Sequence, residues 1–157
     1  LVDEGQLAWD QPIIDILPEF KLWDQYSTSN LTFRDLLTHR SGMPRHEFIW
    51  YNSKMTRNEL LKRIRYLQPS FDIRERYQYG NLMYFTTGMA IERLLGRSWE
   101  DLVRERILNP LEMTSTNFSI EESQKTSDYA FPYLEKNEQL RQIPFRNLSL
   151  IGAAGSI

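Results

Sequence analysis

The feature that most constrains this chain is a series of well-marked helix starts and stops. Thr32-Phe33-Arg34-Asp35 and Thr56-Arg57-Asn58-Glu59 each place a threonine three residues before a carboxylate, which is the pattern of a capping box. Two further helices are expected to start near Asn81 and at Ser98. The matching stop signals are Ser41-Gly42, Pro69, Gly96 and Pro110. The sequence therefore predicts a mostly helical organisation.

Apolar residues recur at helical spacing in three of these segments, and we expect each stripe to face a core rather than a ligand. The stripes are Leu60, Ile64 and Leu67; Leu82, Phe85 and Met89; and Trp99, Leu102, Val103 and Ile107. Residues 1–9 resemble the tail of a helix that is stopped by Gly5.

The character of the chain changes after Thr116. Residues 130–134 and 139–144 flank the polar run 135–138, in which Asn137 favours a turn. A hairpin is therefore expected here, and the fold should combine many helices with a few short strands.

The composition excludes several kinds of function. The 157 residues include 19 basic and 21 acidic side chains, and a net charge of −2 provides no electrostatic footprint for nucleic acid. No stretch approaches the ~18 apolar residues of a membrane span. Because there is no cysteine, disulfides, thiol catalysis and cysteine-bound zinc are excluded. Neither a metal nor an organic cofactor is implied, and the oligomeric state is left open.

The segment Tyr77-Gln78-Tyr79-Gly80-Asn81 is the strongest candidate for chemistry. A Tyr and an Asn two residues apart in a tight turn project to the same side. A buried Tyr near cations can act as a base, and an Asn amide can position a substrate carbonyl. The alternative is that Asn81 caps a helix beside a core tyrosine.

The chain has two histidines, His39 and His46, whose spacing does not fit a metal site. His39 lies at the expected end of a helix, where a partly charged imidazole would interact favourably with the helix dipole. Capping and packing are therefore the favoured roles for His39.

Four blocks of the sequence together resemble one family, and they occur in that family's order. The blocks are Leu1-Val2-Asp3-Glu4-Gly5-Gln6-Leu7, the run from Leu31 to Pro44, Tyr79-Gly80-Asn81-Leu82-Met83-Tyr84, and the run from Ile107 to Thr116. The family is that of the serine beta-lactamase-related hydrolases, which includes class C beta-lactamases, D-alanyl carboxypeptidases and related esterases. The resemblance implies an α+β, beta-lactamase/transpeptidase-like fold, of which residues 1–157 would form mostly the helical lobe.

The resemblance also implies roles for individual residues. Tyr79 matches the Tyr of the family's second catalytic element, which relays a proton to or from the nucleophile and the leaving group. Asn81 matches its Asn, which binds the substrate carbonyl. His46 follows the Ser-Gly-Met-Pro turn and falls where class C enzymes place a residue that contacts substrate, although a plain surface role is as well supported. A small-molecule or peptide substrate and a periplasmic or secreted location follow from the family alone.

The sequence departs from the family at its first and third catalytic elements. No Ser-x-x-Lys occurs, since Ser123-Gln124-Lys125 is one residue short. Lys125-Thr126-Ser127 imitates the third element within a polar run, so Lys125 is expected to be a solvated surface residue. Glu112 replaces the usual Gly of its block.

These departures lead us to expect that residues 1–157 are an internal part of a domain that lacks its nucleophile helix and its C-terminal sheet. The chain begins at Leu1 without Met, and Gly152-Ala153-Ala154-Gly155-Ser156 resembles the lead-in to a helix. On its own, the fragment should be inactive and poorly stable.

Three functions follow from these observations. The favoured one is a serine hydrolase that cleaves amide or ester bonds through an acyl-enzyme. The first alternative is a non-catalytic relative that binds peptides or partners in the same cleft. The second is a helical interaction module in which Tyr79-Gly80-Asn81 only caps a helix.

Overall fold

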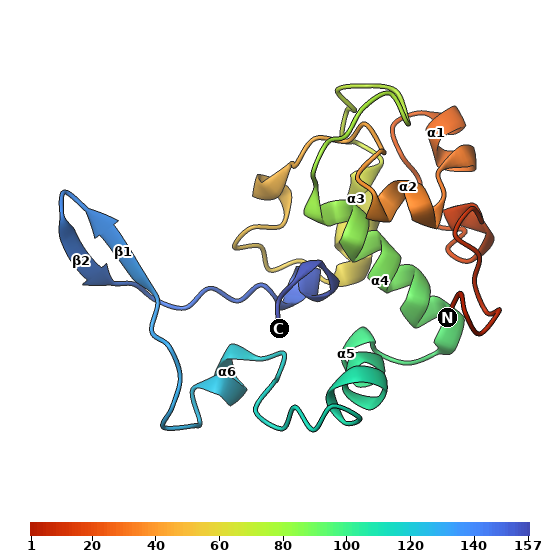
Figure 1. Ribbon diagram of the computed structural model, residues 1–157. Coiled ribbons are helices and arrows are strands. Elements are labelled where there is room, and N and C mark those ends of the chain that lie inside the picture. The colour runs from red at the N-terminus through yellow and green to blue at the C-terminus, as the bar shows by residue number, and fades with distance from the viewer.

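The computed structural model describes all residues 1–157 and consists of a helical body with an extended arm (Figure 1). The α-helices are α1 (Gln25–Asn30), α2 (Phe33–Leu37), α3 (Arg57–Ile64), α4 (Asn81–Leu95), α5 (Trp99–Val103) and α6 (Ile120–Ser123). The tighter or wider turns are η1 (Ile13–Asp15), η2 (Glu47–Ile49), the π-helix η3 (Arg104–Leu108) and η4 (Ser149–Ala154). The strands are β1 (Tyr133–Lys136) and β2 (Gln139–Gln142). None of the helices combines the length and apolarity needed to cross a membrane.

Helix α4 lies at the centre of the helical body, where it packs against α2, α3, α5 and η4 (Figure 1). The core beneath these elements is one cluster of 17 buried apolar residues. The stripe residues Leu60, Ile64, Leu82 and Phe85 belong to this cluster, as predicted. The apolar stripe of α4 therefore anchors this helix in the core, and the helix begins at the Tyr79–Asn81 turn.

Both predicted capping boxes are formed. Thr32 accepts a hydrogen bond from the Asp35 amide, Thr56 accepts one from the Glu59 amide, and each carboxylate reaches back to the threonine amide. Helix α2 nevertheless ends at Leu37, before the predicted stop at Gly42. The reason is that His39 adopts a left-handed conformation, with φ of 57°, which turns the chain away from the helix axis.

The prediction for Ile107 is wrong. Leu102 is buried, but Ile107 is 48% exposed. The chain changes from α to π winding at Arg104, and the wider turn rotates the following side chains away from the α-helical stripe.

The first residues form the hydrogen bonds of a helix C-terminus. The Gly5 amide donates to the Val2 carbonyl at 2.9 Å, and the Gln6 amide donates to the Leu1 carbonyl at 3.0 Å. Gly5 has φ of 69°, so the pattern is that of a Schellman motif. The predicted stop at Gly5 is confirmed, within a run of turns.

The arm carries the predicted hairpin. Strands β1 and β2 pair antiparallel from Tyr133 opposite Gln142 to Lys136 opposite Gln139. Asn137 and Glu138 both have positive φ, at 51° and 60°, which is typical of a type I′ turn. All eight strand residues are exposed, and Figure 1 shows the hairpin standing away from the helical body.

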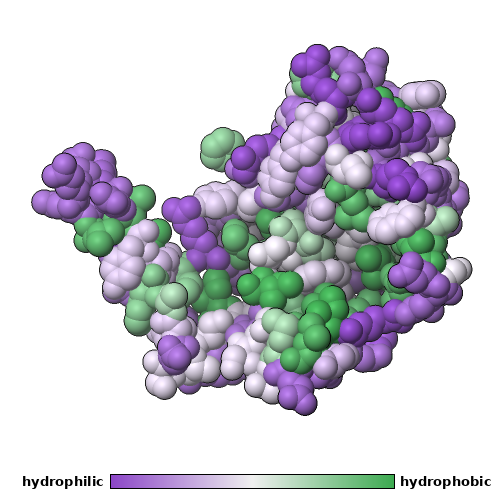
Figure 2. Space-filling model, in the orientation of Figure 1, coloured by the Kyte–Doolittle hydropathy of each residue, from purple (hydrophilic) through white to green (hydrophobic).

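The Gly-Ala-Ala-Gly segment is not a lead-in but part of an element. Gly152, Ala153 and Ala154 lie within η4, which Gly155 ends with φ of 118°. Small residues let η4 cross α4 closely, since a Cβ added at Gly88 would lie 2.5 Å from the Ala153 methyl. Figure 2 shows apolar side chains at the surface around η4 and α5, whereas the hairpin tip is polar.

Candidate active site

The Tyr79-Gly80-Asn81 turn lies at the start of α4. Gly80 is the N-cap residue with extended backbone and provides no side-chain cap, and Asn81 is the first helical residue. The Tyr79 hydroxyl donates a hydrogen bond to Asn81 Oδ1 at 2.8 Å. The two side chains therefore meet on one side of the turn, as predicted. Asn81 does not cap α4 and is instead occupied with Tyr79.

Tyr79 is not buried. It is 42% exposed, so it is not the core tyrosine of the capping alternative. A cation lies beside it, since the guanidinium carbon of Arg45 is 5.3 Å from the ring centroid. Arg45 is also paired with the Glu47 carboxylate. The phenol hydroxyl is thus accessible and has positive charge nearby.

The turn lies on an open surface. The segment 43–45 packs against it, since a Cβ at Gly80 would lie 3.7 Å from the Met43 carbonyl oxygen and 3.9 Å from that of Pro44. A cavity of about 200 Å³ lies elsewhere, between Phe118 and Leu148. Tyr79 and Asn81 therefore lie beside the segment 43–45, with Tyr79 exposed and Asn81 partly exposed.

His39 lies beneath the turn and is almost fully buried. Its ring stacks on Tyr84, with centroids 5.1 Å apart, and lies 4.7 Å from the ring of Tyr79. Its Nδ1 accepts the Gly80 amide at 3.4 Å. The predicted packing role is confirmed, but the expectation of a partly charged imidazole is wrong, because burial lowers the pKa of His39 and favours the neutral form.

His46 is half-buried on the adjacent turn, in a left-handed conformation with φ of 45°. Its Nε2 lies 3.2 Å from the Gln68 carbonyl oxygen. This contact turns the imidazole toward Gln68, and no hydrogen bond joins it to Tyr79 or Asn81. The structure thus brings Tyr79 and Asn81 together, whereas His46, the residue after Arg45, forms no hydrogen bond with either of them.

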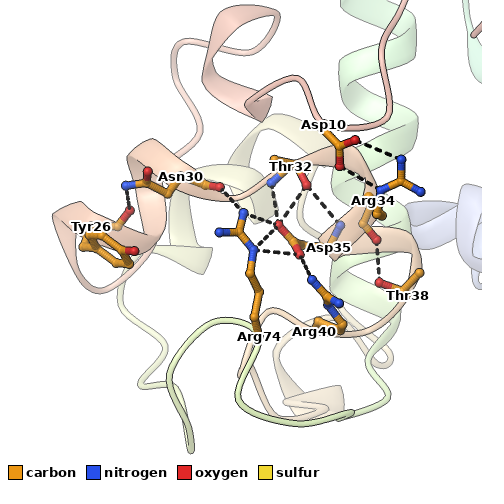
Figure 3. Close-up of polar contacts among 9 residues, drawn as sticks. All are labelled: Asp10, Tyr26, Asn30, Thr32, Arg34, Asp35, Thr38, Arg40 and Arg74. Carbon is orange, nitrogen blue, oxygen red and sulfur yellow. Dashed lines mark hydrogen bonds and ion pairs between the residues drawn. The ribbon is translucent and has the colours of Figure 1, made fainter.

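The loop that leads into Tyr79 is held by the buried carboxylate of Asp35 (Figure 3). Arg74 donates to both oxygens of Asp35, at 2.7–3.1 Å, and Arg40 donates at 3.0 Å. The Arg74 amide also donates to the Arg40 carbonyl at 2.7 Å, and the Gln78 amide to the His39 carbonyl at 2.8 Å. These contacts fix residues 70–78 against the end of α2.

The charge of Asp35 is stabilised in place. Burial raises the pKa of the Asp35 carboxyl, but hydrogen bonds from Arg74, Thr32 and Arg40 outweigh this and hold its pKa below the ordinary value. The sequence identified Asp35 only as a capping residue. Its pairing with Arg74 joins residues 39 positions apart, and no local pattern announces such a contact.

The remaining polar candidates lie away from the turn. Lys125 is exposed and paired with Glu122, which agrees with a solvated surface residue. No group of three or more His, Asp or Glu side chains is arranged to hold a metal ion.

Comparison with known proteins places this geometry in a family. The model of the Beta-lactamase family matches residues 1–156. Among curated proteins, Unguisins hydrolase ungD' of Aspergillus campestris is 34% identical over 99% of the chain and 32% of its own length. The chain therefore spans about a third of the length of this relative.

Solved structures agree with the sequence match. The octameric penicillin-binding protein homologue of Pyrococcus abyssi is 28% identical with a TM-score of 0.78, over 97% of this chain and 39% of its own. The D-amino acid amidase of Ochrobactrum anthropi is 25% identical with a TM-score of 0.74, over 99% of this chain and 45% of its own. These neighbours have the α+β fold expected from the resemblance, and residues 1–157 correspond to its mostly helical part. The chain belongs to the Beta-lactamase family.

Proposed function

We propose that residues 1–157 supply the second catalytic element of a serine hydrolase, with Tyr79 as the proton-transfer group and Asn81 as the substrate-binding amide. The observation that carries this proposal is the 2.8 Å hydrogen bond between the exposed Tyr79 hydroxyl and Asn81. Family membership supports hydrolase chemistry in general.

In the proposed reaction, a serine hydroxyl attacks the carbonyl carbon of an amide or ester. As the new carbon–oxygen bond forms, the phenol oxygen of Tyr79 accepts the serine proton and passes its own proton to the neutral amine of the Lys of the first element, which gives that proton back to Tyr79 in the next step. Tyr79 then returns a proton to the leaving amine or alcohol as that bond breaks. Water hydrolyses the acyl-enzyme and regenerates the serine.

Asn81 and Arg45 complete the proposed surface. The Asn81 amide has donors and an acceptor, and its Oδ1 keeps the Tyr79 hydroxyl on the side where the substrate would lie. The Arg45 guanidinium provides positive charge beside the phenol ring of Tyr79, whose hydroxyl exchanges the proton. His46 is proposed to contact the substrate farther along the same edge, so His46→Ala should raise KM and leave kcat unchanged.

The nucleophile is proposed to come from a part of the protein outside these residues, because residues 1–157 contain no Ser-x-x-Lys. We propose in the same way that a nucleophile helix and a sheet from outside residues 1–157 complete the domain. Names of relatives, an unguisins hydrolase and a D-amino acid amidase, support an amide or related acyl bond as the substrate class.

A fluorophosphonate probe, which labels activated serines, tests this function. We expect the complete protein to be labelled and residues 1–157 alone to be unlabelled. Ser123→Ala in the complete protein is the matched control, and it should be labelled as fully as the parent, since Ser123 only resembles the motif. A complete protein that binds peptide but is never labelled would instead favour the non-catalytic alternative. Absence of both labelling and binding would favour the interaction module.

A further inference from the structure

His39 is the one buried titratable side chain that touches the catalytic turn and has no role in the proposed reaction. It lies two residues beyond the end of α2 with φ of 57°, a left-handed conformation that is uncommon for residues other than glycine. Its backbone is held on both sides, because its amide donates to Leu36 and its carbonyl accepts the Gln78 amide. The imidazole is therefore fixed in place before it meets the turn.

Three tyrosine rings surround the imidazole. Tyr84 of α4 stacks on it at an interplanar angle of 24°, and Tyr77 meets it edge-on with centroids 5.5 Å apart. Tyr79 is tilted by 47° and is the closest of the three, at 4.7 Å. The Tyr84 hydroxyl donates to the Leu37 carbonyl at 3.1 Å, which holds the stacking partner against the end of α2. The ring position of Tyr79 is thus defined by contact with His39.

The peptide between Tyr79 and Asn81 rests on the same imidazole. The Gly80 amide donates to His39 Nδ1 at 3.4 Å. An acceptor at Nδ1 requires a neutral ring with its proton on Nε2, because the imidazolium has a proton on both nitrogens. A proton on Nδ1 would face the Gly80 N–H directly and push the turn away.

We propose that neutral His39 is a positioning residue that holds the Tyr79 hydroxyl on Asn81 by accepting the Gly80 amide and packing against the Tyr79 ring. This inference rests on the proposed function of Tyr79. It extends that function by making proton transfer depend on a group that never touches the substrate.

Protonation of the His39 imidazole itself is the event that would break its contact with the Gly80 amide, as the groups that face it show. From the 70–80 loop and α4 these are the phenol rings of Tyr77, Tyr79 and Tyr84. The nearest charged neighbour along the chain, Arg40, is already paired with Asp35. Burial lowers the pKa of His39, so the neutral form predominates at pH 7 and is lost only on acidification.

Two substitutions separate positioning from simple packing. His39→Asn keeps an acceptor near the position of Nδ1, tolerates the left-handed backbone and does not titrate. His39→Leu keeps apolar volume but removes the acceptor. Misplacing a catalytic group by about 1 Å can cost ~100-fold in rate, so we expect His39→Leu to slow acylation of the complete protein by 10- to 100-fold. We expect His39→Asn to remain within about threefold of the parent, on the same argument.

The pH profile and an activity-independent signal complete the test. The parent should lose acylation rate below about pH 6.5, the ordinary histidine range or lower, whereas His39→Asn should lack that acid limb. In protein labelled with ¹⁵N-glycine, the Gly80 amide peak, assigned by its loss in Gly80→Ala, should titrate together with His39 in the parent and stay fixed in His39→Asn.

The results that would overturn the inference are distinct from a failure of the proposed function. A Gly80 peak that does not move when His39 titrates overturns it, even if no serine is ever acylated. So does a His39→Leu protein that acylates at the parent rate, or a His39→Asn protein that retains the acid limb. If Tyr79→Ser loses acylation and no His39 variant does, the catalytic role of Tyr79 stands and the positioning role of His39 is refuted.

Discussion

Replacing Gly42 by Ala should destabilise the protein more than any other single-methyl addition at a left-handed glycine. Gly42 has φ of 72°, and its carbonyl accepts the Ser70 amide at 2.9 Å. A Cβ added here would lie 2.0 Å from the Phe71 carbonyl oxygen, whereas real Cβ atoms essentially never come closer than 3.0 Å. Backbone must therefore move by about 1 Å, since no flexible side chain can yield in its place.

The cost has two parts. A left-handed alanine costs roughly 1 kcal/mol relative to glycine. Displacing Phe71 also weakens the hydrogen bonds from Ser70 to Gly42 and from Arg74 to Arg40, each worth about 1 kcal/mol. The expected loss is therefore about 3 kcal/mol.

Gly96→Ala is the matched control. Gly96 has φ of 64° but nothing within 4 Å of an added Cβ, so only the backbone part, roughly 1 kcal/mol, applies. The free energies of unfolding of the two variants, measured with urea on the complete protein, should differ by about 2 kcal/mol, which is the steric and hydrogen-bond part alone. Equal destabilisation by the two substitutions would refute the idea that the Gly42 contact holds the loop that leads to Tyr79.

Three further predictions concern the polar contacts. The pKa of Asp35 is lower in the folded state than in the unfolded one, so the contribution of its charge to stability is complete above about pH 4 and is lost as pH falls through the folded pKa. Asp35→Asn should therefore lower the free energy of unfolding by about 2 kcal/mol at pH 7, measured by thermal unfolding, and by much less near pH 2. Arg57 joins the carboxylates of Glu92 in α4 and Glu100 in α5 to the Ser149 carbonyl, so Arg57→Met should lower stability by about 2 kcal/mol and speed hydrogen exchange in η4. Arg97→Met, which removes an exposed ion pair, is the control and should lower stability by about 0.5 kcal/mol or less. Thr56→Ala should lower stability by about 1 kcal/mol and Thr56→Ser by only a few tenths, and equal losses would contradict the capping role.

The helix starts could be predicted because their causes are local. The hydroxyl and carboxylate of each capping box lie within four residues of one another, and so do the two residues of the hairpin turn. The end of α2 could not be predicted, because the left-handed conformation of His39 is accompanied by a hydrogen bond to Gln78 in a distant loop. The prediction that Ile107 is buried is wrong for another reason, since the spacing of the apolar residues does not reveal the change to π winding.

The same distinction divides the candidate site. Tyr79 and Asn81 are two residues apart, and both the turn and the family resemblance identify them. His39 and Gly80 are 41 residues apart, and Asp35 and Arg74 are 39 apart. These pairs meet only when the 70–78 loop packs on the end of α2, so the sequence points to the proposed catalytic pair but not to the residues that we propose position it.

The role of Tyr79 is tested most directly by the single-turnover rate of serine acylation in the complete protein, with Tyr79→Phe compared with Tyr66→Phe. Both substitutions remove one hydroxyl from an exposed tyrosine, but only Tyr79 is bonded to Asn81. Removal of a general acid–base group typically costs 10²- to 10⁴-fold, so we predict a loss of at least ~100-fold for Tyr79→Phe. Tyr66→Phe should acylate at the parent rate. Acylation by Tyr79→Phe at the rate of Tyr66→Phe would contradict the assignment of Tyr79 as the proton-transfer group.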